Sequence, residues 1–486
     1  MFGFLQSMLD KGITKERNQR FAEIAELLKT DVDALSAFES AYAAHALADD
    51  SVDDKDFFEI NAKQAAEMHM GIPADKCDGL GNESEVHVII SRIVEELISI
   101  TPVWSYDGKN CHYERALKRE PDHPVTNEDL KRIPEPLRPK LTGSLMQVEI
   151  RQPSCFSLLE TYQMYQKEKN PDKKQNLYGM FRQGLDLLDL DPVTYEMIGT
   201  NPMSMGHWLP QIAEAARHQD FFKIPKTTVI KVPPPMLQLT RLDYYSMNRT
   251  TLDIVDRYCG KVFNLDEEKE YFIKTGTYSS KFDFRNAHVH GAREVRELGE
   301  YLLFIHHQAL MMSGPFNNRC IYGASTTNEW VVREFIQDKE NNPAIYKGLP
   351  LHTEYRVFVD FDAKEILGMN PYWDPEVMKQ RLGNGPDADN PHNVHDYITY
   401  LAHEETLMKR YHCNKDAVLR HVEDLLQDVE GLSGQWSLDI MQNGEDFWII
   451  DMALAANSAL NECVPKEKIK KTEENWIPEK GQLAFL

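Results

Sequence analysis

Residues 446–460 read DFWIIDMALAANSAL and place one carboxylate, Asp451, at the end of an otherwise apolar run. The residues before it, Trp448, Ile449 and Ile450, predict a short strand with both faces covered. A charged group in such a place costs several kcal/mol unless a partner compensates it. The first question about this chain is therefore what Asp451 faces.

A second strand that ends in a carboxylate lies just before this one. Residues 434–441, GQWSLDIM, carry Asp439, and the following QNGE predicts a tight turn, so the two segments should pair as a hairpin. Asp439 and Asp451 would then share one surface of a sheet and repel each other unless a cation lies between them. Mg²⁺ is a hard ion that proteins hold with one or two carboxylates and substrate phosphates. The alternative is that each aspartate ends a strand and faces water.

The composition is that of a soluble globular chain. Its 486 residues predict roughly two or three domains, and 42% hydrophobic and 27% charged residues argue against large-scale disorder. The net charge of −23 does not favour a nucleic-acid partner or an anionic membrane. The sequence shows neither a long apolar run nor the order of a signal peptide, and the seven scattered cysteines form no CxxC pair. These features predict a cytoplasmic protein with reduced thiols and no membrane partner.

The pattern of apolar residues along the sequence changes near residue 221. Residues 1–220 carry apolar residues mostly at helical spacing and predict a mainly helical N-terminal domain. Residues 221–465 alternate strand-like and helix-like segments, which predicts an α+β region. Residues 466–486 form a charged C-terminal tail.

Within 221–465 the pattern predicts specific elements. Strands are expected at 226–231 (followed by an extended Pro-rich boundary segment), 270–276, 280–284, 329–336, 354–361 and 365–372, besides the hairpin. Helices are expected at 250–263, 292–312, 392–412 and 415–431.

Two of these strands carry cationic side chains that suit phosphate. Lys274 ends the strand EYFIK, and the loop TGTYSS that follows has small residues whose backbone N–H groups could approach phosphate oxygens, with Lys281 behind them. Arg356 lies in mid-strand on the same face as Glu354 and offers a planar fork to phosphate or carboxylate. The alternatives are a surface hairpin turn for the first pattern and a pair between Arg356 and Glu354 or Glu334 for the second.

Several familiar sites have no support in the sequence. It contains no GxxxxGK[ST] or GxGxxG for a nucleotide, no GxSxG for a hydrolase and no HExxH or CxxC for zinc.

The order of the elements resembles the ATP-grasp superfamily over roughly residues 225–465. That order is a strand with a lysine, a small-residue loop, a second strand, a helix, the strands VVREFI and EYRVFV, and the Asp-bearing hairpin. The resemblance implies a two-subdomain ATP-grasp fold after the helical N-terminal region, with ATP and Mg²⁺ as ligands. Within the superfamily, the motifs are similar to the branch that includes a eukaryotic assembly chaperone for a translation initiation factor.

The resemblance also implies roles for individual residues. Lys274 and Arg356 would be the catalytic residues, both contacting phosphate, and Lys231 would be an earlier phosphate-binding lysine. The hinge Glu334, Phe335 and Ile336 would read adenine, Asp439 and Asp451 would hold Mg²⁺, and the phosphate loop would comprise Thr275, Gly276, Ser279, Ser280 and Lys281. One departure concerns the metal site: where the family has asparagine two residues after the last acidic ligand, this chain has Ala453, and the next candidate ligand is Asn457.

Two functions follow from the resemblance. The first is a ligase that forms an acyl-phosphate from Mg–ATP and a carboxylate, which could belong to a small acid, a peptide or a protein, and then joins it to an amine or thiol. The second is an ATP-binding assembly factor or chaperone without ligase turnover, which the missing asparagine at 453 favours.

Overall fold

The computed structural model describes residues 83–113, 201–241, 247–312, 327–385, 388–455, 458–460 and 463–469, with shorter pieces between 125 and 199. The helices predicted before residue 83 and most of the tail after residue 466 lie outside the described residues. Within the described part, no helix is both long and apolar enough to cross a membrane.

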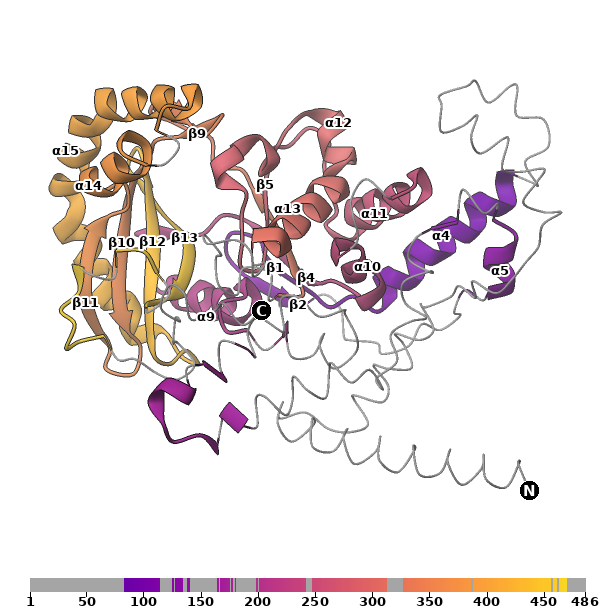
Figure 1. The fold of residues 1–486 in the computed structure, drawn as a ribbon, viewed down its shortest axis with the longest axis horizontal. Coiled ribbons are helices and arrows are strands. Elements are labelled where there is room, and N and C mark those ends of the chain that lie inside the picture. The colour runs from indigo at the N-terminus through magenta and orange to yellow at the C-terminus, as the bar shows by residue number, and fades with distance from the viewer. Residues whose placement is uncertain are drawn as a thin grey trace.

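A six-stranded antiparallel sheet forms the centre of the molecule (Figure 1). Its order is β2-β1-β4-β7-β5-β6, and neighbours pair antiparallel throughout. The apolar helices α4 (Glu83–Ser99), α11 (Arg249–Val262) and α13 (Leu298–Met312) pack in one core with this sheet. The strands are β1 Val103–Tyr106, β2 Cys111–Tyr113, β4 Thr227–Lys231, β5 Tyr271–Thr275, β6 His288–Val289 and β7 Glu329–Glu334.

A second, five-stranded sheet has the order β11-β10-β12-β13-β3, and only β3 joins it in parallel. Its strands are β3 Phe222–Lys223, β10 Thr353–Asp360, β11 Glu365–Pro371, β12 Gln435–Asn443 and β13 Asp446–Leu454. The long helix α15 (Pro391–Asp428) lies along the outer side of this sheet (Figure 1). Helix α9 (Met205–Ala216) contributes Trp208 and Leu209 to a core that includes residues of both sheets.

The architecture is mixed α+β, as the sequence predicted. The first sheet contains strands from both sides of residue 221, because β1 pairs with β4 through Val103 opposite Ile230. The N-terminal half therefore supplies strands β1, β2 and helix α9 to the body that carries the site, besides α4 and α5 (Asn127–Lys131).

Local predictions were wrong at four places. Residues predicted as the strand 280–284 fall in the 3-10 helix η5 (Lys281–Asn286), where only Phe284 is buried. The Pro-rich segment forms α10 (Pro234–Gln238), because proline fits the first turn of a helix; η3 (Leu239–Arg241) follows it. The helix at 292–312 is two helices, α12 (Gly291–Arg296) and α13. The two helices expected between 392 and 431 are the single helix α15.

Short elements close the side of the second sheet that faces the first. They are the strand pair β8 (Ala344–Ile345) and β9 (Leu349–Pro350), helix α14 (Pro375–Met378) and the π-helical turn η6 (Lys379–Gly383). Trp373, Tyr400 and Leu407 form a small core beneath them with Ile345.

Candidate functional site

A cleft opens between the two sheets and gathers most of the residues that the sequence singled out. It encloses roughly 920 Å³, including space open to solvent. The first sheet lines it through β5, η5 and the end of β7, and the second sheet through β10, β12 and β13. Among the predicted residues the lining includes Lys274, Ser279, Lys281, Glu334, Phe335, Ile336, Asp439 and Asp451.

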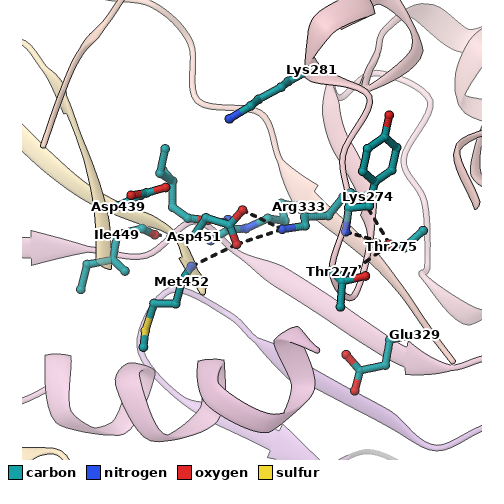
Figure 2. Close-up of polar contacts among 12 residues, drawn as sticks. Lys274, Thr275, Thr277, Lys281, Glu329, Arg333, Asp439, Ile449, Asp451 and Met452 are labelled. Atoms are coloured by element: carbon teal, nitrogen blue, oxygen red, sulfur yellow. Dashed lines mark hydrogen bonds and ion pairs between the residues drawn. The ribbon is translucent and has the colours of Figure 1, made fainter. Parts of the chain in front are cut away.

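The predicted hairpin is confirmed, and its two carboxylates are neighbours. β12 and β13 pair antiparallel, with Asp439 directly opposite Asp451 and a register shift immediately beyond Asp439. The two side chains therefore share one stretch of the cleft wall. Each of them faces a cationic side chain of the protein, and Figure 2 shows the one that Asp451 faces, Lys274.

Asp451 faces Lys274, which comes from the other sheet. Lys274 Nζ lies 3.0 Å from both carboxylate oxygens of Asp451. The lysine side chain is 2% exposed and the aspartate 43%, so the ammonium lies behind a carboxylate that opens into the cleft. Burial alone would raise the pKa of Asp451, but Lys274, Lys281 and Arg333 together hold that pKa below its usual value. Burial lowers the pKa of Lys274, and Asp451 partly opposes this shift.

Asp439 pairs with Arg356 inside the second sheet. Arg356 Nε and one terminal nitrogen donate to the two oxygens of Asp439 at 2.8 and 2.7 Å, and the other terminal nitrogen donates to the carbonyl of Ala459 at 3.2 Å. The ion-pair partner of Arg356 is therefore Asp439, and not Glu354 or Glu334, the two partners considered from the sequence. This bidentate pair raises the pKa of Arg356 above its ordinary value, although burial opposes the rise.

Lys281 and Tyr372 join the two sheets on the other side of the carboxylates. Lys281 Nζ donates a hydrogen bond to the Tyr372 hydroxyl and lies 4.5 Å from the centre of its ring. The guanidinium carbon of Arg356 lies 4.6 Å from the centre of the same ring. Both cations therefore contact Tyr372, which offsets part of the repulsion between them. Figure 2 shows Lys281 projecting toward the side of the cleft where the two carboxylates lie.

Two further charged residues at the cleft were given no role in the predicted binding site. Arg333 of β7 donates to the carbonyls of Ile449 and Ile450, and thereby ties the first sheet to β13 just before Asp451. Burial lowers the pKa of Arg333 to about 10, which still leaves it charged at neutral pH. Burial raises the pKa of the Glu354 carboxyl to about 7, with Asp439 adding to the shift and Lys281 and Arg356 opposing it.

The cleft brings cations and carboxyl groups together in equal number. Four cations (Lys274, Lys281, Arg333, Arg356) lie in or beside the lining with four carboxyl groups (Asp439, Asp451, Glu334, Glu354), and Glu354 is only partly ionised near neutral pH. The chain as a whole has a net charge of −23. The cleft is therefore far less acidic than the rest of the protein, which lowers the electrostatic cost of admitting an anion.

The predicted hinge forms an apolar wall, but two of its three backbone N–H groups are already used. Glu334 N–H donates to the carbonyl of Lys226, and Phe335 N–H donates to that of Glu270. For Ile336 the described residues show no such bond. Apolar lining comes from Phe272, Phe284, Phe335, Ile336, Leu349, Met441 and Ile450.

The predicted phosphate loop is anchored at its single glycine. Gly276 N–H donates to the carbonyl of Glu329 at 3.0 Å, and its carbonyl accepts from Met205 N–H, at the start of α9, at 2.9 Å. The buried Glu329 carboxylate also accepts from Gly206 N–H at 2.8 Å. Burial raises the pKa of Glu329, against the effect of this bond. Helix α9 therefore braces the loop from behind (Figure 2 shows Glu329 below Thr275 and Thr277).

Other predicted residues lie away from the cleft surface. Lys231 is exposed at the end of β4, and neither it nor Thr275, Gly276, Ser280 or Arg356 belongs to the lining, although Arg356 contacts the lining residue Asp439. Asn457 lies outside the described residues. Within the described part of the chain, no three His, Cys, Asp or Glu side chains gather as a metal cluster.

Sequence reasoning gave no role in the site to Arg333, Tyr372 or Glu329, and considered Glu354 only as a partner of Arg356. Arg333 and Glu329 belong to the strand EWVVREFI and Glu354 to EYRVFV, so a polar residue inside an apolar strand was the available signal. Tyr372 ends a strand that had been assigned no chemistry, and only its contacts with Lys281 and Arg356 reveal it.

Comparisons with known proteins give limited information. No family model matches the chain, and no curated protein matches it. Among solved structures, C-terminally truncated Cdc123 from Schizosaccharomyces pombe matches with a TM-score of 0.31 and 16% identity, over 55% of this chain and 92% of that one. Cdc123 from the same organism matches with a TM-score of 0.28 and 14% identity, over 52% and 84% of the two chains. TM-scores this low assign neither a fold family nor a function to the chain.

Proposed function

We propose that the cleft binds ATP together with Mg²⁺, in an ATP-grasp arrangement formed by residues 221–465. The observation that carries the proposal is the convergence of Lys274, Lys281 and Arg356 on two facing carboxylates, Asp439 and Asp451. In such a group of ion pairs, the cations can bind phosphate and the carboxylates can bind a metal ion. The side chains of Lys274, Lys281, Arg333 and Arg356 offer positive charge to a triphosphate.

The proposed binding mode divides the cleft into two parts. The apolar wall of Phe335, Ile336 and Phe284 would take the adenine base, and the Ile336 N–H would be the hinge donor to it. Lys274, Lys281 and Arg356 would contact the phosphates. Asp439 and Asp451 lie opposite each other and offer carboxylate oxygens, a donor set that fits Mg²⁺, which would neutralise phosphate charge and fix its orientation.

For the use of the nucleotide, we favour a structural or switching ligand of an assembly factor, without ligase turnover. Both oxygens of Asp439 are engaged by Arg356, and Ala453 offers no ligand where the ATP-grasp pattern has asparagine. The site therefore has the means to bind a metal–nucleotide complex but few ligands for a second metal. The partner of such a factor would be a protein.

A ligase is the second candidate, and Glu354 is the observation that favours it. Its carboxyl group, with a pKa of about 7, lies beside Lys281 and Arg356. In a ligase, a carboxylate substrate would take the γ-phosphate of ATP, and an amine would then attack the acyl carbon. The bond from that carbon to the phosphate oxygen would break, phosphate would leave, and Glu354 would accept the proton of the amine.

Calorimetric titration tests the proposal directly. ATP should bind the full chain in the presence of Mg²⁺, and adenosine should bind more weakly because it lacks phosphates. Absence of binding by ATP with and without Mg²⁺ would rule the proposal out. Formation of ADP that depends on an added acid or peptide would favour the ligase, whereas binding without such turnover would favour the assembly factor.

A further inference from the structure

The two members of the Lys274–Asp451 ion pair differ in their exposure and in the number of oppositely charged neighbours they have. The ammonium of Lys274 is almost completely enclosed, and its hydrogen-bond partners among the described residues are the two oxygens of Asp451. Asp451 is open to the cleft and accepts a hydrogen bond from the N–H of the next residue, Met452, at 3.0 Å. The positive charges of Lys281 and Arg333 also act on it. The lysine depends on the aspartate for a counter-ion, but the aspartate has other positive neighbours.

We infer that Asp451 is an internal counter-ion that occupies Lys274 until a metal ion takes the carboxylate, so that the metal controls access of phosphate to the lysine. This inference rests on the proposed function and adds the order of events within it. In the ligand-free protein the carboxylate stands where a phosphate oxygen would have to approach the ammonium. A phosphate that arrives without metal must compete with Asp451 and is repelled by it. A metal ion on Asp451 removes both obstacles at once.

Reciprocal coupling is the consequence that can be measured. If the carboxylate shields the lysine from phosphate, then the lysine must equally weaken the affinity of the carboxylate for a metal. Removing either member of the pair should therefore improve binding of the other member's ligand. A site in which the ion pair is only a structural brace would show losses in both cases.

The first test uses Asp451→Asn and titrates ATP and inorganic triphosphate in the presence of EDTA. The expected result is at least about a tenfold gain in metal-free affinity for both probes over the wild type, with loss of the Mg²⁺ dependence. Asp446→Asn is the matched control: it lies on the same strand and pairs with Lys223 and Lys339 away from the cleft, so its metal-free affinity should not change. Equal or weaker metal-free affinity in Asp451→Asn would overturn the inference.

A second variant keeps the inference testable if Asp451→Asn, which strands a buried ammonium, does not fold. Lys274→Gln leaves the partly exposed Asp451 free, and it should bind Mn²⁺ alone more tightly than the wild type, as followed by electron paramagnetic resonance. Unchanged or weaker Mn²⁺ affinity would contradict the inference.

The two proposals can fail separately. Binding of Mg–ATP by the wild type without a gain in either variant would leave the function standing and remove the control by metal. If the wild type does not bind Mg–ATP but the two variants gain affinity for triphosphate and Mn²⁺, the proposed function fails and the coupling between Lys274 and Asp451 stands.

Discussion

Arg356 on β10 and Asp439 on β12 are register partners in one sheet and are also joined side chain to side chain by two hydrogen bonds of 2.8 and 2.7 Å. The side chains are 11% and 8% exposed, so water does little to screen the pair. A planar guanidinium that meets both oxygens of a carboxylate is fixed in one orientation. The wall of the cleft is thus built before any ligand arrives.

The buried pair should be costly to break from one side. Asp439→Asn should destabilise the protein by about 3 to 5 kcal/mol, because Arg356 would keep its charge in a buried place without a carboxylate. Urea denaturation measures this change, with Asp446→Asn, which removes an exposed pairing on the neighbouring strand, as a control expected to change stability by about 1 kcal/mol or less. A loss for Asp439→Asn no larger than that of the control would show that the pair is not a structural element.

Lys274 should distinguish triphosphate from nucleoside. Lys274→Ala is expected to weaken ATP binding more than adenosine binding, since the lysine is assigned to phosphate and not to the base. Titration of both ligands into the variant and the wild type gives the two ratios. If adenosine and ATP lose affinity equally, Lys274 acts on the shape of the whole cleft and not on phosphate.

Tyr372 should act on phosphate binding through Lys281. Tyr372→Phe removes the hydroxyl that accepts from Lys281 but keeps the ring beside both cations, and should weaken ATP by about tenfold. Tyr372→Leu also removes the ring and should weaken ATP further, because Lys281 and Arg356 then lose their contacts with the aromatic ring. Adenosine affinity is the internal control and should be similar in both variants. Equal ATP affinity in Tyr372→Phe and the wild type would mean that the hydroxyl does not position Lys281.

Glu354 should make stability fall as the pH rises through the neutral range. Its folded pKa of about 7 lies above the ordinary value of 4.5, so between these values the folded state holds a proton that the unfolded state has lost. The contribution is fully present below pH 4.5, is lost as the pH rises toward 7, and is constant above it. The total is about 3 kcal/mol on the scale of 1.36 kcal/mol per pKa unit.

The measurement is urea denaturation at pH 5 and pH 8 for the wild type and Glu354→Gln. Other groups also titrate in this range, including Asp256, whose burial raises its pKa to about 8, so only the difference between the two proteins reports Glu354. The variant should lose less stability than the wild type between the two pH values. Parallel losses would place the Glu354 pKa near its ordinary value.

The sequence predicted what is local in this site. The hairpin of Asp439 and Asp451 followed from two apolar segments and a turn, and both carboxylates were placed on one surface. A hairpin needs only neighbouring residues, so its register is contained in one short stretch. The lysine, the small-residue loop and the arginine strand were identified in the same way.

The partners of these residues could not be predicted from the sequence. Lys274 and Asp451 are 177 residues apart, and Arg356 and Asp439 are 83 apart, so only the folded chain shows which cation meets which carboxylate. The sequence argument placed Mg²⁺ opposite Asp451 because it had no way to place Lys274 there. The proposed metal would therefore have to separate Asp451 from Lys274 in order to bind. No local sequence pattern suggests this.

Two of the wrong local predictions, the strand at 280–284 and the break within α15, have simple causes. In the segment SKFDF, Phe282 and Phe284 alternate like a strand, but Phe282 is 40% exposed and only Phe284 packs inside, as a 3-10 turn requires. In α15, the two expected helices, 392–412 and 415–431, left a break at residues 413–414. The buried positions Leu407, Tyr411, Val418 and Val422 nevertheless keep helical spacing across it, so the helix continues.

Gly276 should be intolerant of a side chain although its backbone is not strained. A Cβ there would lie 2.5 Å from Thr327 Oγ1 and 2.8 Å from Glu329 Oε2, which are held in a buried network. Gly276→Ala should therefore destabilise the protein by about 1 to 3 kcal/mol and weaken ATP by displacing the loop. Gly260→Ala, in helix α11 with no atom within 4 Å of the added Cβ, should instead stabilise it by about 0.5 to 1 kcal/mol. Urea denaturation should give opposite signs for the two variants, and the same sign would show that the network around Glu329 yields easily and does not anchor the loop.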